Sequence, residues 1–410
     1  MFRWNNVYLV GFVFGVSILL ILAGNRFTEN PNYRPYVENG RNVRKFLRID
    51  NGEYGERQVS ETTSKHVQPD LDKILSNTRQ QIKTLLANYN LSSAGVTKLE
   101  DLILETGGKP LISLIISTWR SGTTFLGDIL NSRPGNYYHY EPLLKFGIIS
   151  IRGPPNSAAA LEMLRNMLKC NYDGMKDYFD YGSANLHQFT HNTRLWDQCK
   201  YRRQLCLDAD FTSKFCKLFP FHSMKVVRVR LDLVEELLQD KDLNLRVMLL
   251  IRDPRGVMQS RQHRDWCQPA PDCWEPALLC DDMIRDYVAA SRLMEKYPDR
   301  LTVLRFEELA LQPDPTIRKL FKFLRLSMTA GVEEFLHGHT NWEVGGVSST
   351  YRISKEVPFR WKYILDFKYV EELQESCKEA MQLWGYKPAH NASHMTSKTF
   401  FPLDTYSISV

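Results

Sequence analysis

The sequence has little net charge, no paired cysteine motif and no internal repeat. Its 410 residues include 53 Lys and Arg against 47 Asp and Glu, and this excess of +6 is too small to select nucleic acid, glycan or membrane as a partner. None of the eight cysteines forms a C-x-x-C pair of the kind that binds zinc, so no metal is expected and an oxidising compartment is the simpler interpretation. Because 43% of the residues are hydrophobic, the chain can bury a sizeable core, which excludes disorder throughout.

An uncharged apolar segment, residues 7–24, reads VYLVGFVFGVSILLILAG and has about the minimum length of a membrane-spanning helix. Arg3 precedes it, and the positive-inside tendency then predicts a cytoplasmic tail of residues 1–6 and a lumenal position for the rest. A cleaved signal peptide is the alternative, but no clear small-x-small cleavage site follows. The glycosylation sequons at Asn90 and Asn391 agree with lumenal exposure. We therefore expect a single-pass type II membrane protein.

Residues 25–108 are expected to form a lumenal stem. Up to about residue 70 the stem has few clustered apolar residues and cannot fold alone. The helix expected next is amphipathic and packs on its own domain or else on a partner chain; the sequence leaves open whether the protein is a homodimer. Its apolar residues recur at helical spacing: Leu71, Ile74, Leu75, Ile82, Leu85 and Leu86.

Apolar runs alternate with helical patterns in a domain expected over residues 109–390, which residues 391–410 follow as a tail. Each run suits a strand buried on both faces, and the runs are 111–116, 224–229, 245–251 and 301–306. The helical patterns between them are 158–169, 231–239 and 280–296. This order predicts an α/β fold with a P-loop-type parallel sheet flanked by helices, which binds ligands at the carboxyl ends of its strands.

A short loop between the first strand and a helix has the composition of an anion site. It reads Ser117-Thr118-Trp119-Arg120-Ser121-Gly122-Thr123-Thr124, and Phe125 begins the apolar part of the helix. Unpaired N–H groups and the helix dipole attract an anion at such a point, Gly122 permits close approach, and Arg120 supplies a forked cation. The loop lacks the spacing and the lysine of a Walker A motif, which counts against nucleoside triphosphate hydrolysis. Taken alone, it could equally be an ordinary helix cap.

A second strand–turn–helix segment begins at Arg252. This arginine stands at the carboxyl end of a strand, Asp253 and Pro254 are placed as N-cap and first helical residue, and Ser260 lies about two turns along the helix. Arg252 and Ser260 could therefore point to one phosphate above the sheet. The alternative for Arg252 is a surface arginine paired with Asp253 or with an exposed glutamate.

The two segments resemble the phosphate-binding motifs of sulfotransferases. The first is similar to the 5′-phosphosulfate loop in the form T-x-R-S-G-[TS]-[TS]-F-[LV]-G of the Golgi carbohydrate 6-O-sulfotransferase family, and the second to the 3′-phosphate motif. The resemblance covers about residues 109–388 and implies a P-loop-type sulfotransferase domain in the Golgi membrane, with no role for nucleic acid. The implied acceptor is the 6-hydroxyl of galactose, N-acetylglucosamine or N-acetylgalactosamine in a glycan or proteoglycan. The implied donor is 3′-phosphoadenosine 5′-phosphosulfate (PAPS), bound by Arg120, Ser121, Gly122, Thr123, Thr124, Phe125, Arg252 and Ser260.

Further site residues follow in part from the same resemblance and in part from the chemistry of the transfer. Arg352 and Ser354 look like part of a late nucleotide-binding loop, with solvated surface charge as an equal alternative. Lys225 could assist Arg120 in catalysis by adding positive charge at the reacting group, or it could face water from an edge strand. For the proton acceptor, the resemblance of the E-P-L segment indicates Glu141, with His139 as the second candidate. Glu141 could instead pair with an arginine and hold its loop.

Two other functions remain alternatives. A lumenal kinase or triphosphatase would need Mg²⁺ and a Walker-type lysine, and a lectin-like or heparin-binding membrane protein would use the basic excess without chemistry. Cys267, Cys273 and Cys280 also indicate a disulfide-tied loop near the acceptor, although their spacing does not decide which of them pair.

Overall fold

The computed structural model describes residues 71–344 and 349–408, with a parallel sheet at the centre. The strands are ordered β2-β3-β1-β4-β5, and every neighbouring pair is parallel. The prediction of a parallel α/β sheet is therefore confirmed. The strand bounds are β1 Leu111–Ile116, β2 Asn136–Tyr140, β3 Phe221–Val226, β4 Leu245–Ile251 and β5 Leu301–Arg305.

Two strands differ from the expectation based on apolar runs. That criterion misses β2, because its Asn-Tyr-Tyr-His-Tyr sequence is polar and aromatic although four of its five residues are buried. It also places β3 three residues too late, at 224–229 instead of 221–226. The ladder stops at Val226 because this residue pairs with Ile116, where β1 ends.

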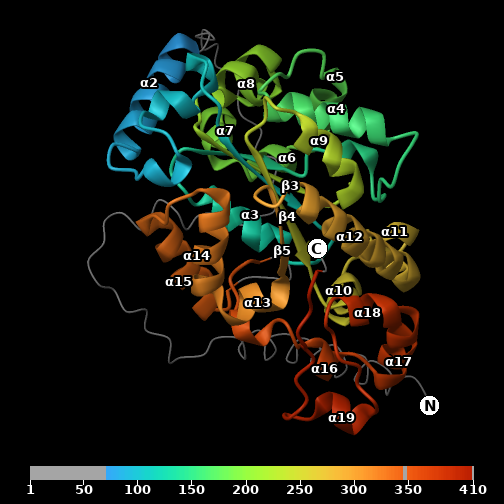
Figure 1. Cartoon of the computed structure of the whole chain (residues 1–410). Helices are drawn as coiled ribbons and strands as arrows, with labels where there is room; N and C mark the ends of the chain where they lie inside the picture. Colours follow the sequence, from blue (N-terminus) through green and yellow to red (C-terminus); the bar gives the residue numbers. More distant parts are fainter. Residues whose placement is uncertain (1–70, 345–348, 409–410) are drawn as a thin grey trace, which may run out of the picture. The chain divides into compact units, whose positions relative to one another are not determined.

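Helices cover both faces of the sheet (Figure 1). The predicted helix at 158–169 corresponds to α4, the one at 280–296 lies within α12, and 231–239 forms a 3₁₀ turn (Leu231–Val234) followed by α9. The helix bounds are α2 Leu71–Leu85, α3 Thr123–Asn131, α4 Ser157–Leu168, α5 Lys176–Ala184, α6 His187–Thr190, α7 Thr193–Cys199, α8 Ala209–Cys216, α9 Glu235–Gln239, α10 Pro254–Arg261, α11 Pro271–Trp274, α12 Pro276–Lys296, α13 Phe306–Leu311, α14 Pro313–Leu324, α15 Ala330–Asn341, α16 Trp361–Ile364, α17 Phe367–Ser376, α18 Lys378–Leu383 and α19 Ala392–Thr396.

Alternate residues of β2 show what covers each face of the sheet. Tyr138 faces α3, where a Cβ on Gly127 would lie 2.0 Å from the Tyr138 hydroxyl, so only glycine permits this approach. Tyr137 points to the other face and packs its ring on Phe215 of α8, with 6.3 Å between ring centroids. The α3 face and the α8 face therefore carry different side chains to the carboxyl end of β2.

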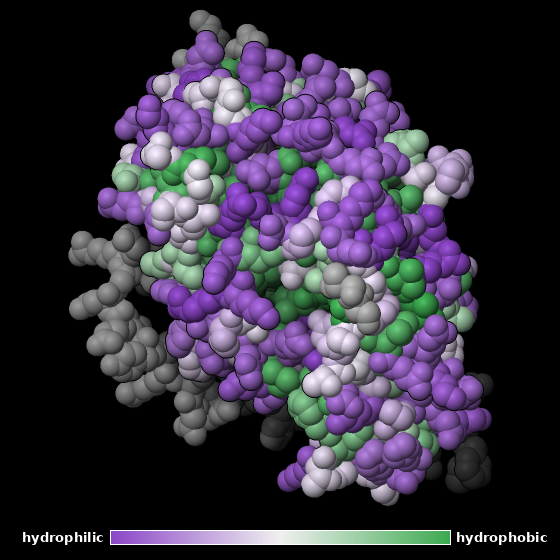
Figure 2. Space-filling model, in the orientation of Figure 1, coloured by the Kyte–Doolittle hydropathy of each residue, from purple (hydrophilic) through white to green (hydrophobic). Residues whose placement is uncertain are grey.

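Helix α2 packs on the domain, since Leu75 and Ile82 belong to the same apolar cluster as the sheet. The predicted cytoplasmic tail, the span at 7–24 and stem residues 25–70 lie outside the described ranges. Within those ranges no helix is long and apolar enough to cross a bilayer. Hydrophilic side chains cover most of the face seen in Figure 2, and hydrophobic ones gather toward its middle.

All eight cysteines are paired in disulfides. The bond between Cys267 and Cys273 confirms a disulfide-tied loop after α10, whereas Cys280 is bonded to a distant partner at the end of α17. The pairs are Cys170–Cys216, Cys199–Cys206, Cys267–Cys273 and Cys280–Cys377.

Candidate functional site

The loop between β1 and α3 is held by a hydrogen bond to the neighbouring strand, and it lies at the carboxyl edge of the sheet. The Ser117 hydroxyl donates to the carbonyl of Leu250 in β4 (2.6 Å), which ties the loop to the neighbouring strand. Gly122 has φ +88° and precedes α3 directly, and a Cβ there would lie 2.3 Å from the Phe306 ring. The residue must therefore be glycine for the chain to turn here, and the first N–H groups of α3 are presented at one point.

The segment after β4 forms the helix start that its sequence predicts. Asp253 caps α10 through its side chain, which accepts from the Arg255 N–H, and Pro254 is the first helical residue. The Asp253 carboxylate also pairs with the Arg255 guanidinium at 2.7 Å. Asp253 is thus occupied by Arg255, and the alternative in which it pairs with Arg252 does not hold.

Arg252 is buried beside the first loop instead of lying on the surface. Its Nη1 donates to the carbonyl of Arg120 (2.8 Å), and its guanidinium lies 4.6 Å from the Phe306 ring centroid. Its Nε is buried with no hydrogen-bond partner in the described structure. A buried, unpaired guanidinium donor is costly, and an anion bound at this place would satisfy it.

Arg120 joins the two segments. Its Nε donates to the hydroxyl of Ser260, two turns along α10, at 3.0 Å. Burial lowers the pKa of the Arg120 guanidinium, and the positive charges of Arg264 and Arg252 lower it further, to about 10. The two segments separated in sequence therefore form one cationic site at the carboxyl ends of β1 and β4.

Arg264 belongs to this site, and the sequence patterns miss it. It follows α10 by three residues, and its Nε and Nη2 are both buried and lack a partner among the residues that the structure describes. The only available signal is its position four residues after Ser260, which is a helical spacing beyond the end of the helix. Arg120, Arg252 and Arg264 together concentrate positive charge and donors for an anion.

Lys225 and Glu141 form the second half of the site, on the α3 face of the sheet. Lys225 lies in β3, between β2 and β1, and is buried, so the alternative of an edge-strand lysine facing water is wrong. Its Nζ donates to Glu141 Oε1 (2.5 Å) and to the Thr124 hydroxyl (3.2 Å). Burial alone would lower the pKa of Lys225, but the negative charge of Glu141 outweighs it and the pKa is raised. Lys225 is therefore a protonated, buried cation that contacts the β1–α3 segment through Thr124.

The Glu141 carboxylate bridges two cations. Its second oxygen accepts from Nη1 of Arg228 at 2.6 Å, a contact that the sequence predicts only as an unspecified arginine. Burial by itself raises the pKa of Glu141, but Lys225 and Arg228 overcome this and hold it at about 2. Glu141 is thus fully ionised at neutral pH, which a proton acceptor must be, and it also holds Lys225 in place.

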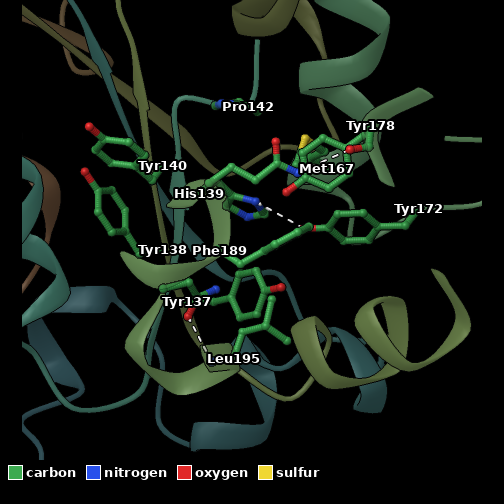
Figure 3. Close-up of a pocket in the computed structure, with 12 residues that line it drawn as sticks. Tyr137, Tyr138, His139, Tyr140, Pro142, Met167, Tyr172, Tyr178, Phe189 and Leu195 are labelled. Carbon is green, nitrogen blue, oxygen red and sulfur yellow. Dashed lines mark hydrogen bonds between the residues drawn. The ribbon is translucent and has the colours of Figure 1, made fainter. Parts of the chain in front are cut away.

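His139 does not join this set. It points to the opposite face of the sheet, where its Nδ1 lies 3.3 Å from the hydroxyl of Tyr172, while Tyr138 and Tyr140 lie on the other side of the strand (Figure 3). Burial lowers the pKa of His139 well below its usual value, and the charge of His222 lowers it further. The structure therefore separates the second candidate base from Arg120 and Lys225, because neighbouring residues of a strand face opposite ways.

A group with metal-ligand chemistry surrounds His139. Ligand atoms of His139, Cys216 and His222 lie within 4.8 Å of one another. However, the Cys216 sulfur is bonded to Cys170 and offers no thiolate, which a Cys ligand requires. This group does not fit a metal site as it stands.

The late candidates, Arg352 and Ser354, lie in the segment that follows α15. Arg352 Nη1 donates to the Glu343 carboxylate (2.8 Å), and Arg360 pairs with the same carboxylate. Ser354 is buried at the start of a 3₁₀ turn that contacts α13, the helix that begins with Phe306. The assignment of Arg352 and Ser354 to phosphate contacts stays a prediction.

A model of the sulfotransferase domain family matches residues 112–385, which include both segments and Lys225. The chain belongs to the sulfotransferase domain family. This enzyme is a transferase, and its described fold has the parallel sheet flanked by helices. The chain is 28% identical over 328 residues to human carbohydrate sulfotransferase 6, and the match covers 68% of this chain and 81% of that protein. Human carbohydrate sulfotransferase 5 is 28% identical over 337 residues (70% and 80%), and human carbohydrate sulfotransferase 3 is 25% identical over 331 residues (70% and 69%).

Proposed function

We propose that this sulfotransferase moves a sulfuryl group from PAPS to a hydroxyl of a carbohydrate. One observation carries the proposal: Arg120 donates to Ser260 and accepts from Arg252, so two anion-binding segments act as one site. PAPS carries phosphate at both ends of its adenosine, and a site with two linked cationic segments suits a ligand with two anionic ends. The names of the relatives, all carbohydrate sulfotransferases, favour a sugar as the acceptor.

Each segment would hold one end of the donor. The loop residues Arg120, Ser121, Gly122, Thr123, Thr124 and Phe125 would bind the 5′-phosphosulfate through backbone N–H groups, hydroxyls and the Arg120 guanidinium. Arg252 and Ser260 would bind the 3′-phosphate. The buried donors of Arg252 and Arg264 that lack partners in the described ranges fit an anion at this place.

Lys225 and Glu141 would carry out the transfer. A sugar oxygen forms the new S–O bond, the bond from sulfur to the donor phosphate breaks, and the leaving phosphate keeps the electron pair. Lys225 and Arg120 stabilise the charge that gathers on the sulfuryl and leaving oxygens. A sulfuryl group beside Thr124 would compete for Lys225, and Glu141, released from that contact, would accept the proton of the sugar hydroxyl.

The acceptor position and the compartment belong to the same proposal. The resemblance favours the 6-hydroxyl of galactose, N-acetylglucosamine or N-acetylgalactosamine. A Golgi lumenal position is supported by the apolar segment 7–24, by the four disulfides, and by exposed sequons at Asn90 and Asn391.

The test uses the lumenal chain, sulfur-labelled PAPS and a panel of desulfated glycans without added metal. We expect label in at least one glycan. In a parallel reaction with Mg²⁺ and ATP labelled in its γ-phosphate, transfer of that label, with none from PAPS, would favour the kinase alternative.

Calorimetry with 3′-phosphoadenosine 5′-phosphate (PAP) then tests the donor site. Arg120→Ala, Arg252→Ala and Arg264→Ala should each weaken binding about 10-fold or more, because each removes charge-assisted hydrogen bonds worth about 1.5–3 kcal/mol. Arg285→Ala is the matched control, since Arg285 is exposed and pairs with Asp281 on the same helix, α12. Unchanged PAP affinity in the three site variants would remove the assignment.

A further inference from the structure

Four partly exposed side chains lie over buried Lys225 on the α3 face. Thr124 and Asp128 are one turn apart on α3, Tyr140 ends β2, and His191 follows α6. We call these four residues the Asp128 cluster. Neither the donor site nor the transfer step, as described above, uses Asp128 or His191.

Direct contacts join the cluster to the reacting centre. Lys225 Nζ donates to the Thr124 hydroxyl at 3.2 Å and lies 4.4 Å from the Tyr140 ring centroid. The His191 ring stacks on Tyr140 with 3.7 Å between centroids, and its Nδ1 lies 4.0 Å from Asp128 Oδ1. Asp128 is therefore linked through His191 and Tyr140 to Lys225, the lysine proposed to bind the sulfuryl group.

The charge state of Asp128 is unusual for a part-exposed carboxyl. Burial raises the pKa of Asp128 to about 7, against the opposing effect of Lys225. Burial and the charge of Lys225 lower the pKa of His191 to about 4, so the two side chains do not form an ion pair at neutral pH. The Asp128 side chain is 20% exposed, so a ligand can reach it from the solvent.

The groups that face Asp128 come from several elements. They are Lys225 on β3, Tyr138 and Tyr140 on β2, His191 after α6, and Tyr351 beyond α15. Lys225 is the one cation among these, and it already pairs with Glu141. A carboxylate with hydrogen-bonding capacity to spare suits a ligand that brings hydroxyl donors.

We propose that the Asp128 cluster binds the acceptor sugar: the Asp128 carboxylate accepts hydrogen bonds from its ring hydroxyls, and the exposed part of His191, stacked on Tyr140, packs against its C–H face. This inference rests on the proposed function. Above about pH 7, where Asp128 is ionised, this position favours an uncharged sugar, because Asp128 and Glu141 would then repel a uronate or an already sulfated residue. The cluster thereby places the acceptor hydroxyl beside Lys225 and Glu141, which contact each other directly.

Steady-state kinetics of Asp128→Asn with an accepted neutral glycan test the inference. We expect KM for the glycan to rise at least 10-fold, kcat to stay within about 3-fold, and PAP affinity to remain unchanged, since the amide keeps the shape but not the charge. In the wild type, KM should fall as the pH rises through 7, and Asp128→Asn should lose this dependence. Asp314→Asn is the matched control, because Asp314 is an exposed aspartate at the start of α14.

Thermal unfolding provides a readout that does not depend on activity. The folded-state pKa of Asp128 lies above its usual value of 3.8, so stability that is present below pH 4 is lost as the pH rises to about 7. Asp128→Asn should therefore raise the melting temperature, and by more at pH 8 than at pH 5. A merely structural carboxylate would give a loss at pH 8.

The outcomes separate this inference from the proposed function. If the wild type transfers no sulfuryl group to any glycan, the proposed function fails. If the wild type is active and Asp128→Asn leaves KM unchanged, or abolishes kcat without affecting KM, the acceptor site assigned here is overturned while the enzyme's activity stands.

Discussion

At the scale of single residues, the transfer site depends on two buried cations that share one carboxylate. Lys225 and Arg228 are both buried, and each donates to a different oxygen of Glu141. Removing one partner of such a group leaves uncompensated buried charge, which typically costs about 3–5 kcal/mol. Glu141 therefore has two roles to test apart, as proton acceptor and as the residue that positions Lys225.

Glu141→Gln should lower kcat about 100-fold or more while PAP affinity stays within about 3-fold, because the amide cannot accept the proton. The pKa of about 2 also means that Glu141 of the free enzyme does not titrate between pH 5 and 8, so the wild-type kcat/KM should show no limb from this group there. Its depressed pKa supplies stability above pH 4.5 that is lost as the pH falls toward 2, so the variant should melt lower at pH 7. Full turnover by Glu141→Gln would assign the proton to another group.

Sequence patterns predict the residues of this site that sit at element boundaries. Arg120, Arg252 and Ser260 could be located because each has a fixed place relative to a strand end or a helix start. Arg264, Arg228 and Asp128 could not, since their roles depend on which distant side chains meet them. The choice of His139 as the second candidate base is wrong because neighbouring residues of a strand face opposite sides of the sheet. Tyr140 lies beside Lys225, and His139 therefore points away from it.

At the scale of elements, the loop before α3 depends on a glycine that satisfies two requirements at once. Gly122 has φ +88°, and a Cβ would lie 2.3 Å from the Phe306 ring. Gly107 has φ +83° and ψ 5°, close to the φ +88° and ψ 10° of Gly122, but a Cβ there meets nothing within 4 Å, which makes it a matched control for backbone strain alone. The steric requirement at Gly122 comes from α13, far away in the sequence.

Gly107→Ala should cost about 1–2 kcal/mol of unfolding free energy, the usual penalty for a left-handed alanine. Gly122→Ala should cost several kcal/mol more and abolish PAP binding, since either the loop or Phe306 must move. Urea unfolding and calorimetry measure both effects. Equal losses in the two variants would show that Phe306 does not restrict the loop.

The elements that form continuous apolar runs could be predicted, and those stabilised by particular neighbours could not. β1 and β4 are buried on every residue and match the predicted bounds. β2 was missed because its tyrosines are buried by contacts from opposite faces, Gly127 of α3 on one and Phe215 of α8 on the other. The end of β3 is set by the length of β1, which local sequence does not encode.

At the scale of the whole molecule, the disulfides differ most in how much chain each one closes. Cysteine spacing could not select the pairing, because eight cysteines allow 105 arrangements. The sequence separations are 97 for Cys280–Cys377, 46 for Cys170–Cys216, 7 for Cys199–Cys206 and 6 for Cys267–Cys273. All eight cysteines are buried, so replacing a pair by alanine creates a comparable cavity in each case.

Replacing each pair by two alanines should therefore rank the losses of stability by loop length. Chain-entropy estimates give about 4–5 kcal/mol for Cys280–Cys377, about 4 kcal/mol for Cys170–Cys216 and about 2 kcal/mol for each short loop. Denaturant unfolding of the four double variants measures the order.

The Cys267–Cys273 variant has a second expected effect, because Arg261 donates to the Cys273 carbonyl at 2.5 Å and α10 carries Ser260. PAP affinity should fall in this variant although its loss of stability is small. The Cys280–Cys377 variant should lose more stability and keep its PAP affinity. Equal losses of stability in all four would mean that native packing, and not restriction of the unfolded chain, determines what these bonds contribute.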